Sequence, residues 1–130
     1  MRTMLRCKIH RARVTEVNVD YRGSITIDKR LMEEADLLVY EQVDVLNINN
    51  GARFSTYVIE GERDRGEICL NGAAARLVAK DDVVIILSYH QVPDDEAAHV
   101  TPKLVYVDSA NRIVDADHEK DWAKDLMATL

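Results

Sequence analysis

The stretch EQVDVLNINNGARFSTYVIEGE, residues 41–62, restricts the fold of this chain more than any other, because it has the pattern of a β-hairpin. Asn50-Gly51 lies between two runs in which apolar and polar residues alternate, and this is the strongest short-range hairpin signal. Alternation with period two places one set of side chains on each face of a sheet. The sequence therefore predicts two antiparallel strands here.

Short extended segments continue along most of the chain, and helices are few. Residues 4–19 alternate with one break, which predicts a bent or bulged strand pair. Asp28 is expected to cap a helix that runs to about residue 36, and Ala73–Ala75 to form a short helix. Further strands are expected at residues 25–27, 67–70, 83–90, 103–107 and 112–114, with 83–90 buried, and residues 117–128 have the pattern of a polar helix or a loose tail. This order favours a compact, mainly β barrel with short helices over βαβ alternation.

Composition limits the class of protein. The length of 130 residues favours one domain, and an apolar share of 47% is enough for a core. No apolar leader is visible and no apolar run approaches the roughly 18 residues of a membrane span, which predicts a cytoplasmic protein without a membrane partner. Cys7 and Cys69 form no CxxC pair and are expected to be free and buried. The histidines lack the short-range partners of a zinc motif, so no metal is expected.

The charge of the chain argues against nucleic acid as a partner. Its formal net charge is −6, whereas phosphate binding needs a basic face. One basic cluster does lie within residues 2–13, where the cationic residues are Arg2, Arg6, Lys8, Arg11 and Arg13. Two interpretations stay open: a solvated cationic strand edge, or a surface of which part faces an anionic substrate.

The segment YRGSITID, residues 21–28, also has two interpretations. In the first, Gly23-Ser24 is an ordinary tight turn in which glycine supplies a positive φ and serine bonds nearby backbone. In the second, the Ser24 hydroxyl attacks the adjacent Gly23 carbonyl and converts the peptide bond to an ester. Loss of the serine α-proton then releases the upstream chain, and hydrolysis leaves a pyruvoyl group. Such a group accepts electrons when an amino acid held on it as a Schiff base loses CO₂.

Several separated motifs favour the second interpretation. They are MRTMLRCKIHRARVTE at 1–16, YRGSITID at 21–28, NNGARFSTYVI at 49–59, LNGAAA at 70–75 and VPDDEA at 92–97. In this set and order the chain resembles the pyruvoyl-dependent aspartate 1-decarboxylases, which make β-alanine for pantothenate biosynthesis. The resemblance implies a double-ψ β-barrel, a homotetramer with sites between subunits, and L-aspartate as substrate. It also implies autocatalytic cleavage of the single domain, residues 1–130, into a β chain of residues 1–23 and an α chain of residues 24–130.

The resemblance implies roles for the residues that match the family motifs. Ser24 is the nucleophile of cleavage and the source of the pyruvoyl group, and Gly23 supplies the carbonyl. Thr56 assists processing and binds substrate, while Tyr57 is the proton donor, a role that a phenol fills within hydrogen-bond reach. Taken alone, Tyr57 also fits an ordinary strand tyrosine. We expect Arg53 to pair with the side-chain carboxylate of aspartate, because a tight ion pair to the departing α-carboxylate would stabilise the ground state.

Lys8 and His10 share one face of the first expected strand. The resemblance implies that Lys8 lies near a substrate carboxylate and that His10 is close to the site. The alternative for both is a solvated strand edge.

The small residues after position 70 are a further candidate. Small side chains let backbone N–H groups face an anion. The resemblance assigns substrate binding to Gly72, Ala73 and Ala74. It makes Asn71 a neighbour that shapes the site and Tyr21 a residue that helps to hold the cleavage loop.

The chain departs from the family pattern at a few positions. Leu46 stands where some relatives have an aromatic residue, and Arg76 stands where others have histidine. The resemblance does not extend to the last stretch, about residues 116–130. The sequence does not decide whether maturation needs an accessory protein. A non-catalytic barrel that binds a partner, with the bond between residues 23 and 24 intact, is the competing hypothesis.

Overall fold

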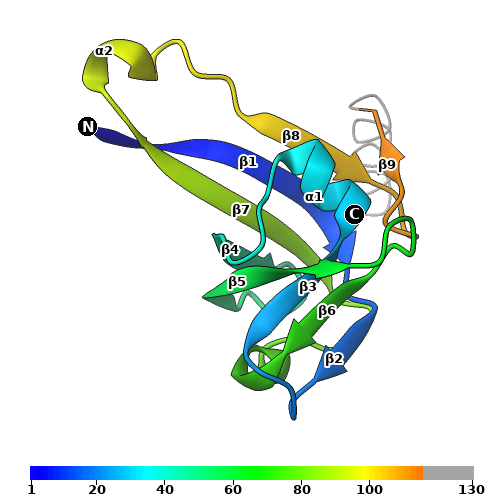
Figure 1. Cartoon of the computed structure of the whole chain (residues 1–130). Helices are drawn as coiled ribbons and strands as arrows, with labels where there is room; N and C mark the ends of the chain where they lie inside the picture. Colours follow the sequence, from blue (N-terminus) through cyan, green and yellow to red (C-terminus); the bar gives the residue numbers. More distant parts are fainter. Residues whose placement is uncertain (116–130) are drawn as a thin grey trace, which may run out of the picture.

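The computed structural model describes residues 1–115, which form a mainly β structure with short helices (Figure 1). The strands are β1 (Arg2–Arg13), β2 (Glu16–Asn18), β3 (Ser24–Asp28), β4 (Gln42–Asn47), β5 (Arg53–Gly61), β6 (Ile68–Asn71), β7 (Val83–Val92), β8 (Lys103–Val107) and β9 (Ile113–Val114). The helices are α1 (Lys29–Ala35), the 3₁₀ helix η1 (Gly72–Arg76) and α2 (Asp94–Ala97). The mainly β prediction is confirmed. The expected C-terminal helix or tail at 117–128 lies outside the described residues.

The strands pair in the order β2-β6-β3-β5-β4-β7-β1-β8-β9. Three pairs are parallel (β2 with β6, β3 with β5, β1 with β8) and the others are antiparallel. Neighbours in the sheet are often far apart in the sequence. Among the described residues, no pairing joins β2 to β9. The double-ψ closure of the barrel therefore stays a prediction.

The hairpin predicted around Asn50-Gly51 is confirmed as β4–β5. Val45 pairs with Phe54, and the turn is closed by hydrogen bonds of 2.8 Å from Asn47 N–H to the Ala52 carbonyl and from Gly51 N–H to the Asn47 carbonyl. Gly51 has a φ of 76°, which a residue without Cβ adopts at little cost.

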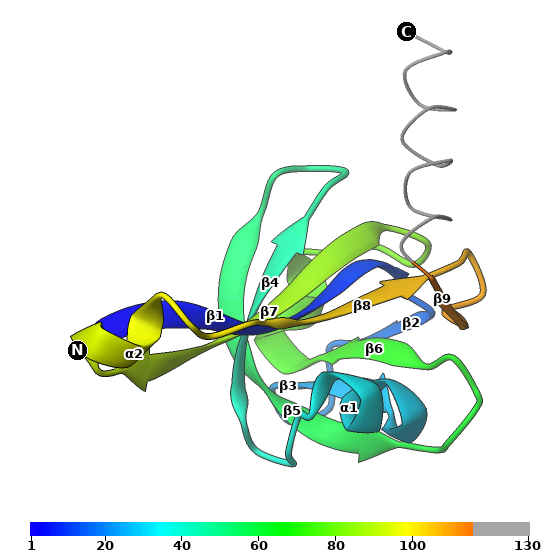
Figure 2. The ribbon, with the colours of Figure 1, turned by 90° about the horizontal axis from the view of Figure 1, so that it is seen from above.

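β1 is long and bent, as the broken alternation predicts. Its register against β7 shifts twice, between Leu5 and Cys7 and between Ile9 and Ala12. The far ends of β1 and β7, with α2, project from the body of the molecule in Figures 1 and 2. Residues 83–90 were expected to be buried throughout, and this is wrong at Tyr89, whose side chain is 46% exposed. The core cluster includes Val84 and Ile86 of β7, and Tyr89 lies beyond them toward the end of the strand.

Helix α1 begins where the sequence predicts. The Asp28 carboxylate accepts a hydrogen bond from Arg30 N–H at 2.8 Å, which is the expected N-cap. The same buried carboxylate accepts from Asp64 N–H at 3.1 Å and Gly66 N–H at 2.6 Å, so it also fixes the loop between β5 and β6. The buried residues of α1 are Leu31, Met32 and Ala35, whose spacing places them on one face of the helix.

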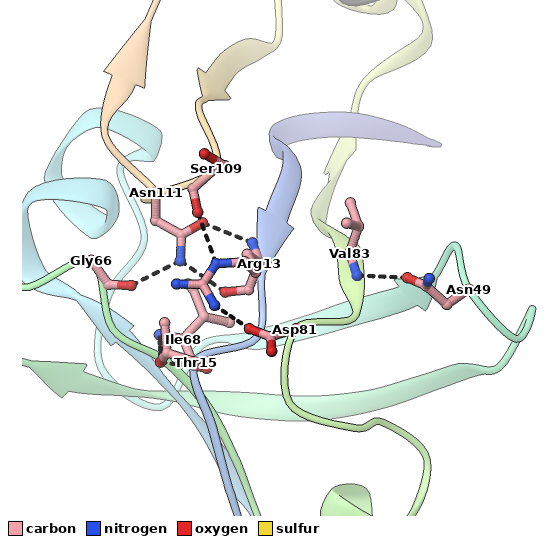
Figure 3. A network of polar contacts seen from close by, with 9 residues as sticks. All are labelled: Arg13, Thr15, Asn49, Gly66, Ile68, Asp81, Val83, Ser109 and Asn111. Carbon is pink, nitrogen blue, oxygen red and sulfur yellow. Dashed lines mark hydrogen bonds and ion pairs between the residues drawn. The ribbon is translucent and has the colours of Figure 1, made fainter. Parts of the chain in front are cut away.

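Asn111 joins three segments that are distant in the sequence (Figure 3). Its side-chain N–H groups donate to the carbonyls of Arg13 and Gly66, each at 2.8 Å, and its Oδ1 accepts from Arg13 N–H at 2.7 Å. The Arg13 guanidinium adds a bond to the Ser109 carbonyl at 2.8 Å and an ion pair with Asp81. The end of β1 is thereby tied to the β8–β9 turn.

Two glutamates are held in contrasting environments. Glu41 accepts from the Arg6 guanidinium and the Ser88 hydroxyl, each at 2.6 Å. Burial raises the pKa of the Glu41 carboxyl, but hydrogen bonds from Ser88 and Leu38 N–H and the charge of Arg6 outweigh burial and lower its pKa overall. Burial raises the pKa of the Glu67 carboxyl, the negative charges of nearby carboxylates raise it further, and the charge of Arg65 offsets only a part of this rise.

Cys7 and Cys69 are free and buried, as predicted. Cys7 belongs to a core built mainly from valine, isoleucine and leucine side chains. Within residues 1–115, no helix is both long and apolar enough to cross a membrane.

Candidate functional site

Gly23 and Ser24 lie where the β2–β3 connection enters the sheet, at the lower end of the molecule in Figure 1. Ser24 is the first residue of β3, is only 1% exposed, and pairs with Asn71 of β6. On its other side β3 runs parallel to β5, where Ile25 pairs with Val58. Continued by one residue, this register places Ser24 beside Tyr57. Continued by two, it places Gly23 beside Thr56.

The Ser24 hydroxyl is held by hydrogen bonds on two sides. Asn71 Nδ2 donates to Ser24 Oγ at 2.9 Å and to Thr26 Oγ1 at 3.1 Å. The hydroxyl itself donates to the Arg22 carbonyl at 3.2 Å. Asn71 Oδ1 in turn accepts from the Cys69 thiol at 3.2 Å. A buried hydroxyl with a fixed rotation is a group that can act as a nucleophile toward a neighbouring carbonyl.

Gly72 packs directly against Gly23, the residue before the bond that is predicted to break. Its φ is 68°, and a Cβ placed on it would lie 2.6 Å from both Gly23 Cα and Gly23 N, and 3.0 Å from the Tyr21 carbonyl oxygen. No L-residue with a side chain fits this position without moving the loop. Gly72 therefore shapes the site through its lack of a side chain.

Gly23 itself does not behave as the turn interpretation expects. The glycines with a positive φ are Gly51, Gly66 and Gly72, and a Cβ on Gly23 would meet nothing within 4 Å. The expectation that glycine supplies a positive φ at position 23 is therefore wrong. The residue that must lack a side chain is Gly72, which lies on the other side of the contact with Gly23.

The other predicted residues near Ser24 come from β5 and η1. Tyr57 is 36% exposed, and its ring lies 6.2 Å from that of Tyr40, centroid to centroid. Ala73 and Ala74 follow Gly72 in η1, so the expected short helix is confirmed as a 3₁₀ helix. The Tyr21 side chain is 52% exposed, and its backbone carbonyl is the part that approaches Gly72.

The predicted cationic residues are not brought to Ser24 of the same chain. Arg53 lies four residues before Tyr57, roughly 13 Å along an extended strand. Its exposed side chain lines a separate pocket of about 230 Å³ with Asp44, Leu46, Phe54, Ser55, Leu87 and Tyr89. Lys8 lies on β1, four strands away from β3 in the sheet order. His10 packs edge-on against the ring of Tyr106 at 5.9 Å, which places it toward β8.

Two residues beside Ser24 escaped the sequence analysis. Thr26 and Cys69 pair with each other across β3 and β6, and both face the same side of the sheet as Ser24 and Asn71. Period-two alternation from Ser24 and from Asn71 was the signal that could have found them. Burial raises the pKa of the Cys69 thiol to about 11, with smaller contributions from the charges of Glu16 and Glu67.

No metal centre accompanies this arrangement in the part of the chain that the structure describes. Nowhere in residues 1–115 do three or more His, Cys, Asp or Glu side chains come close enough together to hold an ion.

Comparison with known proteins gives one consistent result. Residues 1–114 match the family model described as aspartate decarboxylase. An aspartate 1-decarboxylase of Thermoanaerobacter pseudethanolicus is 59% identical over 113 residues, which cover 87% of this chain and 97% of that protein. One of Staphylococcus carnosus is 55% identical over 121 residues, covering 93% and 95%. The crystal structure of a rationally designed protein, mkDPBB_sym_86, aligns with 64% of this chain and 91% of its own at 19% identity and a TM-score of 0.47.

Proposed function

Because this chain belongs to the aspartate decarboxylase family, we propose that it converts L-aspartate to β-alanine and CO₂, as a step of pantothenate biosynthesis. The proposal includes maturation by self-cleavage between Gly23 and Ser24. The observation that carries it is the buried Ser24 hydroxyl, fixed by Asn71 and the Arg22 carbonyl next to the Gly23 peptide. We expect the enzyme to work in the cytoplasm, where free buried thiols such as those of this chain stay reduced.

In the proposed self-cleavage, the nucleophile and the carbonyl that it attacks both come from this chain. Ser24 Oγ bonds to the Gly23 carbonyl carbon, the bond from that carbon to Ser24 N breaks, and the hydroxyl proton ends on the nitrogen. Removal of the Ser24 α-proton then expels the Gly23 carboxylate and leaves a dehydroalanine. Addition of one water and loss of ammonia give the pyruvoyl end. Because attacker and target are adjacent residues, the first step gains from effective molarity.

The residues around Ser24 fit a pyruvoyl group formed at that position. Gly72 leaves no side chain between η1 and residue 23. Asn71 Nδ2 lies 2.9 Å from Ser24 Oγ, the atom that departs with the Gly23 carboxylate, so the amide N–H is left as a donor beside the new group. The pyruvoyl carbonyl supplies the electron-accepting group to which the substrate amine attaches when CO₂ leaves. The rest of the chemistry falls to side chains: Tyr57, beside Ser24 in the register, delivers the proton to the carbon that lost CO₂.

Arg53 and Lys8 are the proposed partners of the substrate carboxylates. The Arg53 side chain is exposed and lines an open pocket, so its guanidinium is available for a bidentate contact to the side-chain carboxylate of aspartate. Since Arg53 lies roughly 13 Å from Tyr57 along β5, it does not complete the site of its own chain. We propose that a second copy supplies these cations, within a homotetramer.

Mass spectrometry of purified protein tests the maturation step. We expect the intact 14.8 kDa chain to be replaced by two fragments that split between residues 23 and 24, with a carbonyl at the new N-terminus. Maturation that occurs only when cell extract is added would identify an accessory protein. Ser24→Ala is expected to stay whole and to release no CO₂ from aspartate. Aged wild-type protein that stays whole in both conditions and is inactive would reject the proposal and favour a non-catalytic barrel.

Two variants together test the shared site. Ser24→Ala and Arg53→Ala should each be inactive alone. Co-expressed chains of the two kinds should recover part of the activity, because mixed oligomers contain sites with an intact Ser24 from one copy and an intact Arg53 from another. No recovery in oligomers shown to be mixed would mean that each site is built within one chain.

A further inference from the structure

Cys69 is linked to Ser24 by hydrogen bonds through Asn71, and none of the steps above uses Cys69. Its thiol donates to Asn71 Oδ1 at 3.2 Å, and Asn71 Nδ2 donates to Ser24 Oγ at 2.9 Å. Cys69 is 5% exposed, Asn71 3% and Ser24 1%, so this chain of contacts is shielded from water. A buried network of this kind has few ways to exchange partners.

An asparagine side chain has two orientations that differ by exchange of its oxygen and nitrogen. The hydroxyls of Ser24 and Thr26 do not choose between them, because each can donate to an oxygen or accept from a nitrogen. The Cys69 thiol does choose. Sulfur is a weak acceptor, and a thiol whose pKa is raised to about 11 by burial keeps its proton at neutral pH and donates it.

The orientation of Asn71 decides where the hydroxyl proton of Ser24 points. With Nδ2 toward Ser24, one lone pair of Oγ is engaged and the proton turns to the Arg22 carbonyl at 3.2 Å. One lone pair then remains, in a fixed direction, for attack on Gly23. In the reversed orientation the proton turns to Asn71 Oδ1, the contact to Arg22 is lost, and the hydroxyl is no longer fixed from two sides.

We propose that Cys69 is a positioning residue for self-cleavage, which sets the orientation of the Asn71 amide and through it the direction of the Ser24 hydroxyl. The inference rests on the proposed function, because it concerns the rate of the same cleavage. Cys69 touches neither the scissile peptide nor the substrate in this role. What it supplies is one donor, and a residue with a hydroxyl in its place can supply the same.

The test compares Cys69→Ala with Cys69→Ser in the full-length chain. The two variants leave a similar space and differ in one hydroxyl. Loss of the intact chain is followed by mass spectrometry after purification under conditions that keep the starting protein uncleaved. We expect Cys69→Ser to cleave within roughly twofold of wild type and Cys69→Ala to be roughly three- to tenfold slower, which is the range for one lost neutral hydrogen bond.

Cys7→Ala is the matched control, because Cys7 is an equally buried thiol on β1 that does not contact Asn71. It should cleave at the wild-type rate. If Cys69→Ala does not fold, Cys69→Val, which fills the space without a donor, takes its place in the comparison. Equal rates for the serine variant and the alanine or valine variant overturn the inference while the proposed function stands. A wild-type chain that does not cleave overturns both.

Discussion

The close approach of Gly72 to Gly23 makes Gly72→Ala the most informative substitution in this chain. Two separate costs add at this position. An L-residue at a φ of 68° costs roughly 1–2 kcal/mol. The new Cβ would also lie 2.6 Å from two backbone atoms of Gly23, and relief of such overpacking costs roughly a further 1–3 kcal/mol. We therefore expect a total loss of about 2–5 kcal/mol in the free energy of unfolding.

Gly51→Ala is a control that carries the first cost alone. Gly51 has a φ of 76°, and a Cβ there would meet nothing within 4 Å. Gly51→Ala is expected to lose about 1–2 kcal/mol in the free energy of unfolding. Both substitutions are made in the Ser24→Ala background, so that every chain stays whole, and unfolding in urea is followed at one fixed protein concentration because subunit association would shift the midpoint. Equal losses for the two variants would refute the reasoning.

Self-cleavage gives a second, independent measure of the same contact. In the chain that keeps Ser24, Gly72→Ala pushes residues 21–23 away from η1 and changes the approach of the hydroxyl to the carbonyl. A displacement of about 1 Å is enough to slow a positioned reaction by up to roughly a hundredfold. We expect Gly51→Ala to mature normally and Gly72→Ala to remain largely intact. Wild-type maturation of Gly72→Ala would show that the loop adapts to the added methyl group.

Three further predictions concern charged side chains. Arg53→Ala should abolish turnover of aspartate while cleavage between residues 23 and 24 continues. Arg65→Ala is the control and should change neither. Failure of cleavage in Arg53→Ala would assign Arg53 a structural role. Because the pKa of Glu41 is lowered in the folded chain, its contribution is present above its ordinary value of 4.5 and is lost as the pH falls through the lower value. Glu41→Gln should therefore be less stable than wild type at neutral pH, with a difference that shrinks in acid; a difference that does not change with pH would contradict this. The pKa of Glu67 is raised in the folded chain. The protonated side chain therefore contributes its full stability below the ordinary value of 4.5, and this contribution is lost as the pH rises through the raised value. Thermal unfolding at pH 7 should show Glu67→Gln to be more stable than wild type, and a gain that persists in acid would point to another cause.

Local signals in the sequence predicted the parts of the fold that depend on neighbouring residues. The β4–β5 hairpin follows from Asn50-Gly51, and the start of α1 follows from Asp28, because turn and cap chemistry act over a few residues. Neither feature requires knowledge of which strands pair with partners distant in the sequence.

What the sequence did not predict depends on contacts between distant segments. Gly72 meets Gly23 only because β6 pairs with β3, across more than forty residues of chain. The positive φ was expected at Gly23 from the dipeptide alone, whereas the sheet places the need for glycine at residue 72. The exposure of Tyr89 likewise depends on how far β1 and β7 extend past the core.

Because Arg53 and Lys8 lie away from Ser24, self-cleavage and decarboxylation should depend differently on the association of subunits. Ser24, Asn71 and Gly72 come from one chain and are already in contact, so self-cleavage should proceed at a rate that does not depend on protein concentration. In the proposed mechanism, decarboxylation also uses Arg53 and Lys8, which lie on β5 and β1. If a second copy supplies them, dilution below the association limit should reduce turnover per cleaved chain and leave the cleavage rate unchanged. A parallel loss of both would mean that contacts between copies also shape the loop at residues 21–23.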